Sequence, residues 1–192
     1  MRFDDFCANF SMVYLCKIFP STWSQYSITG EWSGNTAGGP YPPEELKKPE
    51  ENEEGKEPAV PQDTNNKWFN NPQFRITVKK KCNIIMSVMQ EDEKISKRDY
   101  IPINFLVVRI RSKKDRLWEI NKDDIVLQAI DGQTNTKGQR EITRTCVLTP
   151  EFEKKPVHYM IIPNTEITNK KEGERPFYLR IFSSDPIQLT QL

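Results

Sequence analysis

The sequence predicts an all-β protein, an antiparallel β-sandwich of about eight strands behind a short N-terminal helix. From Trp68 onward, short runs rich in β-branched and aromatic residues recur between polar turns, a pattern typical of strands. No long segment between these runs has the period of an amphipathic helix. This combination favours two antiparallel sheets packed face to face over a parallel sheet with crossover helices.

Eight segments downstream of Trp68 have the strand pattern. Residues 73–78 and 177–182 alternate between apolar and polar side chains, which indicates one buried face. The other predicted strands are 83–89, 103–110, 125–130, 143–148, 157–162 and 187–189. One more strand is expected near the N-terminus, at 12–18.

The first residues carry a helical signal instead. Phe3, Phe6 and Phe10 recur at helical spacing, so 3–10 is expected to form a short amphipathic helix. Together with the strand expected after it, this helix makes 1–20 a helix–strand segment that precedes the sandwich domain.

The sandwich domain is assigned to 21–190 and contains an unusual insertion. Residues 40–66 are rich in proline, glutamate and lysine and have almost no apolar side chains. Such a stretch cannot bury enough surface to offset its ordering entropy, so we expect a disordered, solvated loop. An acidic Ca²⁺ sensor is the alternative interpretation.

Composition excludes several classes of protein. The chain has 28 basic and 27 acidic residues, so no overall attraction to nucleic acid is expected. No apolar run approaches the ~20 residues that a transmembrane helix requires, and the N-terminus has acids where a signal peptide would be basic. The four cysteines form no C-x-x-C pair, so we expect reduced, mostly buried thiols in a soluble, cytoplasmic protein, with peripheral membrane attachment left open.

Catalytic motifs are not found in the sequence. Thiol catalysis requires a cysteine next to a histidine, and the single histidine, His158, lies within a predicted strand. Neither a glycine-rich phosphate loop nor an EF-hand loop is present. We therefore expect no enzyme activity from this chain, and we assign no catalytic residue and no cofactor other than a possible Ca²⁺.

Two acidic clusters at expected strand ends are weak candidates for Ca²⁺ ligands, because loop carboxylates can supply the hard oxygen atoms that this ion prefers. The candidates are Glu91, Asp92 and Glu93, and Asp123 with Asp124. Solvated turns are the alternative.

Basic clusters would form a patch for anionic lipid if the fold brings them together, at about 1 kcal/mol per charge near an acidic surface. The candidates are Lys79, Lys80, Lys81, Arg109, Arg111, Lys113 and Lys114. Lys97–Arg98 and Lys170–Lys171 are also basic. Lysines that protect a sheet edge from pairing are the alternative.

The most specific motif surrounds the insertion. Its residues are Gly30, Trp32, Ala37, Gly38 and Gly39 before the insertion, and Trp68, Asn71, Pro72 and Gln73 after it. Glycines allow tight turns and close backbone approach, the tryptophan supplies a large apolar anchor, and Asn-Pro favours an extended entry into the next strand.

This G-x-W-x-x-x-x-A-G-G stretch, followed by an aromatic residue and N-P-Q-F, resembles the opening of calpain domain III, the C2-like β-sandwich of calpain-type cysteine proteases. Residues 82–90, 159–165 and 171–183 are similar to later strands of that domain. Residues 1–6 are similar to the last helix of the calpain protease core. The resemblance extends over nearly the whole chain.

The resemblance implies a C2-like sandwich that packs against a papain-like protease core, in the same or another chain, and transmits Ca²⁺ or phospholipid signals to it. Two departures are evident. Lys79–Lys81 stand where typical calpains have an acidic loop, and no EF-hand domain is expected after the sandwich, as in atypical calpains. The family's catalytic motifs are not matched. The leading hypothesis is a non-catalytic regulatory and scaffolding domain, the alternative is a stand-alone C2-like module for anionic lipid, and a protein-interaction adaptor is a third.

Overall fold

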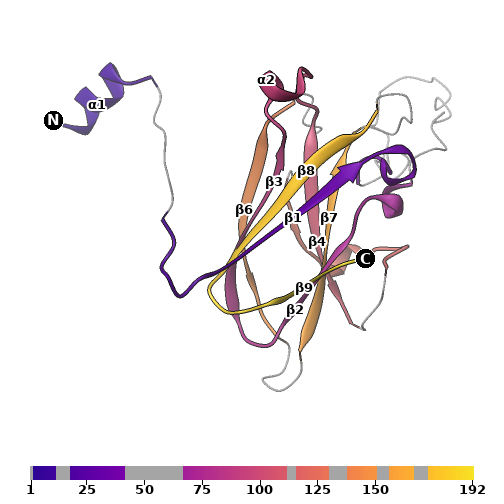
Figure 1. Ribbon diagram of the computed structural model, residues 1–192. Coiled ribbons are helices and arrows are strands. Elements are labelled where there is room, and N and C mark those ends of the chain that lie inside the picture. The colour runs from indigo at the N-terminus through magenta and orange to yellow at the C-terminus, as the bar shows by residue number, and fades with distance from the viewer. Residues whose placement is uncertain are drawn as a thin grey trace, which may run out of the picture.

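The computed structural model describes residues 2–11, 18–41, 67–111, 116–129, 138–150, 156–166 and 173–192, and these contain two stacked antiparallel sheets (Figure 1). The strands are β1 (Ser24–Trp32), β2 (Phe74–Val78), β3 (Cys82–Gln90), β4 (Ile103–Ile110), β5 (Ile125–Gln128), β6 (Glu141–Leu148), β7 (Val157–Thr165), β8 (Arg175–Ser183) and β9 (Gln188–Gln191). The helical elements are α1 (Phe3–Asn9), α2 (Glu93–Ser96) and the 3-10 turns η1 (Gly34–Thr36), η3 (Trp68–Asn70) and η4 (Lys122–Asp124). The all-β sandwich expected from the sequence is confirmed.

The first sheet has the strand order β1-β8-β3-β6, and the second has the order β5-β4-β7-β2-β9. All eight strands expected after Trp68 are present, with ends displaced by three residues or fewer. β1 was missed, because its glycine-containing sequence was interpreted as turns. The alternation of inward Tyr26, Ile28 and Trp32 with polar neighbours is the signal that indicates this strand.

The largest difference between an expected and an observed strand end is at β7. This strand continues through Pro163, although a proline was expected to end it. Pro163 lies opposite Phe105 of β4, and the pairing of β7 with β2 stops at Ile161. Proline cannot donate to a strand ladder. It is tolerated here because, in the described part of the chain, no neighbouring strand lies on its other side to require the missing N–H.

The main core fills the space between the sheets. Alternation places Phe74, Ile76 and Val78 of β2 inward, as expected, where they meet Phe177 of β8 and other side chains of the first sheet. The largest fully buried side chains are Trp32, Tyr159, Phe74, Phe105 and Phe177. This aromatic, close-packed interior is the main source of the stability of the sandwich.

The second sheet is buried on its outer face as well. Leu106, Val108 and Ile110 of β4 point away from the main core and form a second apolar cluster. Tyr41, Trp68 and Leu117, from the segments that flank the sheet, cover this cluster. Burial on both faces explains why β4 has a nearly continuous apolar sequence rather than a strict alternation.

The strand register defines two opposite ends of the sandwich. At one end Trp32 lies opposite Arg175, and Gln90 lies opposite Phe177. We call this the α2 end, because α2 follows β3 there (Figure 1). The β2–β3 turn, Lys79–Lys81, lies at the other end, which we call the lysine end.

The N-terminal helix expected at 3–10 is confirmed as α1, but none of its residues is buried. Figure 1 shows it apart from the two sheets. The strand expected at 12–18 and the insertion expected at 40–66 lie almost entirely outside the described residues. In the described ranges, no helix has the length and apolar character needed to cross a bilayer.

Gly30 tests how the first sheet packs. A Cβ at this position would collide with the Phe177 ring, so Gly30→Ala must displace an aromatic side chain of the core. Overpacking of this kind costs about 1–3 kcal/mol, and we expect that loss in the free energy of unfolding measured with urea. Ser27→Ala, on the exposed face of the same strand, is the control and should change it by less than about 0.5 kcal/mol. Equal stability of the two variants would contradict this packing.

Candidate functional site

Trp32 links the two sheets at the α2 end. Its side chain is 1% exposed, and its ring packs on Phe177 with centroids 4.3 Å apart. Its Nε1 donates a hydrogen bond to the carbonyl of Pro163, on the other sheet, at 3.3 Å. The anchor expected from the sequence is present, and it also satisfies a carbonyl that β2 does not reach.

Asn71 joins the two halves of the motif across the insertion. Its fully buried side chain accepts a hydrogen bond from the Gly38 N–H at 3.0 Å and donates one to the Gly39 carbonyl at 2.8 Å. A Cβ on Gly38 would collide with the Lys67 carbonyl, and Gly39 has a φ of 87°. The paired glycines are therefore required for close approach and for a left-handed backbone.

Gln73 fixes the segment that covers the second sheet. Its Nε2 donates to the carbonyls of Phe69 and Leu117, at 3.1 and 2.9 Å, and its Oε1 accepts from the Leu117 N–H at 2.8 Å. Arg116 donates to the Phe69 carbonyl at 2.9 and 3.0 Å and to two carbonyls that follow. Ala37 and Trp68 are buried in the two cores, and Pro72 follows the extended Asn71. These motif residues make structural contacts.

Lys79–Lys81 and Arg111, from two of the basic clusters, leave the sheet at the lysine end. Lys79, Lys80 and Lys81 are all exposed in the β2–β3 turn. Val78 and Ile110 lie opposite consecutive residues of β7, so Lys79 and Arg111 leave the sheet two strands apart, about 10 Å. The fold thus brings together basic residues whose convergence the sequence left open.

The other basic candidates differ in their surroundings. Arg109 is half-buried in β4, opposite the buried Tyr159. Arg111 is exposed and forms an ion pair of 3.4 Å with Asp124. Lys113 and Lys114 lie outside the described residues.

The acidic candidates do not form one site. Glu91–Glu93 lie at the α2 end, whereas Asp123 and Asp124 belong to η4, beside Arg111 of the lysine end. Asp123 is exposed, and Asp124 is the acid in the ion pair with Arg111. Across the ranges that the structure describes, no three His, Cys, Asp or Glu side chains converge as metal ligands would.

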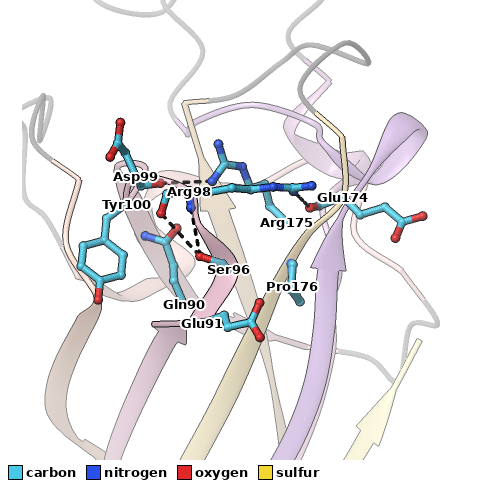
Figure 2. Close-up of a pocket in the computed structure, with 9 residues that line it drawn as sticks. All are labelled: Gln90, Glu91, Ser96, Arg98, Asp99, Tyr100, Glu174, Arg175 and Pro176. Carbon is cyan, nitrogen blue, oxygen red and sulfur yellow. Dashed lines mark hydrogen bonds between the residues drawn. The ribbon is translucent and has the colours of Figure 1, made fainter. Parts of the chain in front are cut away.

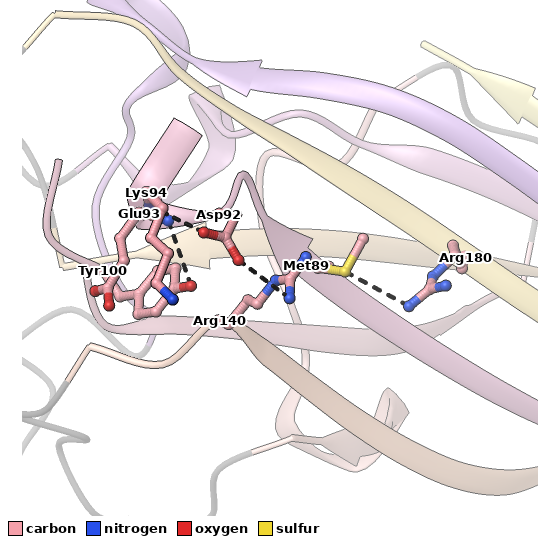
Figure 3. A network of polar contacts seen from close by, with 7 residues as sticks. All are labelled: Met89, Asp92, Glu93, Lys94, Tyr100, Arg140 and Arg180. Atoms are coloured by element: carbon pink, nitrogen blue, oxygen red, sulfur yellow. Dashed lines mark hydrogen bonds and ion pairs between the residues drawn. The ribbon is translucent and has the colours of Figure 1, made fainter. Parts of the chain in front are cut away.

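Asp92 is already engaged through both carboxylate oxygens (Figure 3). Oδ1 accepts the Lys94 N–H at 2.9 Å, which caps the start of α2, and Oδ2 lies 3.3 Å from a guanidinium nitrogen of Arg140. The Glu93 N–H points to the Tyr100 hydroxyl at 3.4 Å. Helix capping therefore accounts for Asp92 without a bound ion.

A cavity of about 230 Å³ opens at the α2 end, between the β3–β4 connection and the start of β8 (Figure 2). Arg98 crosses it to donate to the Glu174 carbonyl at 2.6 Å, and Arg175 crosses in the opposite direction to donate to the Asp99 carbonyl at 3.1 Å. Gln90 lies on the wall. The role of Arg175 was not foreseen, because only the fold brings it to Arg98.

Among the residues that the structure describes, His158 and the three cysteines show no catalytic arrangement. His158 lies in β7, and its Nδ1 is 2.9 Å from the Thr77 hydroxyl. Burial raises the pKa of the Cys82 thiol, and burial together with the nearby Cys82 raises the pKa of Cys146 to about 11. Cys7 is exposed, contrary to the expectation of mostly buried thiols, because α1 has no covering surface. Cys16 lies outside the described residues.

Two antiparallel sheets, with the distinctive motif used for packing, define a β-sandwich domain. The family model for the calpain large subunit, domain III, matches residues 60–182. The chain belongs to this family, and domain III is a non-catalytic domain of calpain proteases.

Calpains match along nearly the whole chain. Calpain clp-1 of Caenorhabditis elegans is 24% identical over 210 residues, which cover 100% of this chain and 24% of the relative. Calpain-B of Drosophila melanogaster is 26% identical over 208 residues, which cover 95% of this chain and 19% of the relative. Calpain-type cysteine protease ADL1 of Oryza sativa subsp. japonica is 24% identical over 201 residues, which cover 98% of this chain and 8% of the relative. The chain thus spans less than a quarter of the length of these relatives.

Asn71 provides a test of the motif. Asn71→Ala would leave the Gly38 N–H and the Gly39 carbonyl buried without partners, and each unsatisfied group costs about 1–3 kcal/mol. We expect unfolding to become easier by at least about 2 kcal/mol in a urea titration. Asn83→Ala, whose side chain is exposed, is the control and should be neutral. A neutral Asn71→Ala would show that the link is dispensable.

Thiol labelling tests the cysteine environments. At pH 8 a thiol with a pKa of about 11 is thiolate in about one molecule in a thousand. In a Cys16→Ser variant, iodoacetamide should therefore modify Cys7 rapidly, and Cys82 and Cys146 only after unfolding. Peptide mass spectrometry measures each site. Equal rates at Cys7 and Cys146 in the folded chain would contradict the burial described.

Proposed function

We propose that this chain is a non-catalytic regulatory and scaffolding domain of a calpain-like cysteine protease and packs against a papain-like protease core, in the same or another chain. The observation that supports this most directly is the exposed helix α1. It has seven residues and none is buried. Isolated helices shorter than about 12–15 residues are marginal in water, so α1 needs a surface to pack on.

The exposed side of α1 is aromatic. Phe3 is 78% exposed and Phe10 50%, and Phe6 stacks on Phe10 with centroids 4.8 Å apart. An aromatic stripe of this kind is typical of a helix face buried in an interface. The resemblance of 1–6 to the last helix of a calpain core supports the proposal that the rest of such a core is the missing surface.

A second element of the proposal is coupling to anionic phospholipid through the lysine end. The three exposed lysines of the β2–β3 turn support it, because they project beyond the end of the second sheet. The same observation favours the alternative function, a stand-alone module for anionic lipid. Asp92 and Asp124 are held by arginines, so we expect Ca²⁺ to contribute little.

Association with a protease core tests the first element. Mixed with the protease core of Calpain clp-1 without that core's own last helix, the chain should form a complex in analytical ultracentrifugation. Phe3→Ser with Phe10→Ser should weaken it at least ~10-fold, since apolar anchors at interfaces contribute more than about 1 kcal/mol each. Ile95→Ser with Val147→Ser removes two other exposed apolar side chains and should have no effect. No complex, or equal weakening by both pairs, would count against docking through α1.

Vesicle sedimentation tests the second element. At low salt, the triple variant Lys79→Gln, Lys80→Gln, Lys81→Gln should lose up to about 100-fold in affinity for phosphatidylserine vesicles, at about 1 kcal/mol per charge. The control variant removes the same number of exposed lysines outside this turn, Lys67, Lys94 and Lys97, and so separates the effect of the turn from that of total charge. Added Ca²⁺ should change little. A wild-type chain that never sediments, with or without Ca²⁺, would exclude both lipid coupling and the stand-alone lipid module.

A further inference from the structure

We propose that the cavity at the α2 end binds a phosphate group, with Arg98 and Arg175 as its ligands. This site lies at the opposite end of the sandwich from the lysine turn, so it is independent of the lipid contact proposed above. At about 230 Å³ it is smaller than the sites of about 300–1,000 Å³ that hold drug-sized ligands. The space suits a small anionic group.

Within the described part of the chain, the two arginines of the cavity are held by neutral groups. Each guanidinium reaches across the cavity to a backbone carbonyl, that of Glu174 for Arg98 and that of Asp99 for Arg175. Neither forms an ion pair with a carboxylate among those residues. Two guanidinium groups that line the same cavity and are held by neutral carbonyls can together bind an anion.

Donors remain available on both side chains. A guanidinium has five N–H donors in a planar fork, and the hydrogen bond to Glu174 uses one nitrogen of Arg98. Nε of Arg175 is enclosed and has no hydrogen-bond partner in the described structure. Guanidinium forks match the geometry of phosphate oxygens, which a lysine ammonium does not.

The walls of the cavity are held in place before any ligand arrives. The Gln90 amide donates to the carbonyls of Ile101 and Gln139, at 2.7 and 2.8 Å. It thereby links the β3–β4 connection to the β5–β6 connection at the α2 end. Gly173, with a φ of 77°, passes beneath the Arg98 guanidinium, where a Cβ would lie 3.8 Å from two of its nitrogens. Pre-organised walls reduce the entropy cost of binding.

Three acids also line the cavity and narrow the choice of ligand. Figure 2 shows the carboxylates of Asp99 and Glu174 directed away from the two guanidinium groups, with Glu91 lower in the cavity. Two arginines are balanced by a phosphate dianion better than by a single carboxylate. The acids repel any anion, but they oppose the many negative charges of a membrane surface more than the charge of one phosphate group, so a soluble phosphate fits better than a lipid headgroup.

Isothermal titration with inorganic phosphate and pyrophosphate, at constant ionic strength, tests the proposal. We expect saturable binding at one site. Arg98→Gln and Arg175→Gln should each weaken it at least ~10-fold, as charge-assisted hydrogen bonds are lost. Arg175→Lys should also weaken it, because the charge stays but the fork is lost. Glu91→Gln should strengthen it by removing a repulsive charge. Arg111→Gln, an exposed arginine at the lysine end, is the control and should bind as wild type.

Absence of saturable binding, or equal losses from Arg98→Gln and Arg111→Gln, would overturn the proposal. Circular dichroism identifies any variant that does not fold. If Arg175→Gln does not fold, the binding measured for Arg98→Gln tests the proposal, because Arg98 is exposed. Vesicles containing phosphatidic acid, tested in the Lys79–Lys81 triple variant, separate the two sources of phosphate. Binding to these vesicles that requires Arg98, without binding of free phosphate, would overturn the assignment to a soluble ligand.

Discussion

The contact of Trp32 with Phe177 and Pro163 is the constraint on which the rest of the sandwich depends. Trp32 ends the edge strand of the first sheet, yet its indole N–H reaches a carbonyl of the second sheet. Phe177, beneath it, lies edge-on to Phe74 of β2, with centroids 6.2 Å apart. A single aromatic cluster thus fixes the distance between the sheets at the α2 end, and Gly30 leaves room for it.

This aromatic cluster also positions the cavity at the α2 end. Arg175 lies opposite Trp32 in the β1–β8 register. The strand pairing that holds β1 to β8 therefore also fixes one wall of the cavity. The lysine turn projects from the far end of β2, where strand pairing alone determines its place. The two ends differ accordingly: one has arginines held by carbonyls, and the other has freely exposed lysines. Under the two proposals above, one end binds a small anion and the other makes broad electrostatic contact.

Much of the fold could be predicted from the sequence, because strand periodicity is a local property. β1 was missed since Gly30 interrupts an otherwise alternating run, and β7 was ended too early because Pro163 is tolerated only where a neighbouring strand is lacking. The motif residues were identified as structural, but the partners of Asn71 lie 32 and 33 residues away and depend on tertiary contacts. The site residues were less predictable, because Arg98 and Arg175 meet only when β3 and β8 pair.

The sandwich is held together by its own core, whereas α1 is proposed to depend on a partner. Hydrogen exchange of the whole chain, alone and with the same clp-1 protease core, tests this most directly. We predict slow exchange in the central strands β3, β7 and β8 in both samples. In α1 we predict fast exchange in the chain alone and strong protection in the complex. Slow exchange of α1 without the core, or no change when the core is added, would contradict the proposal that this helix docks on a protease core.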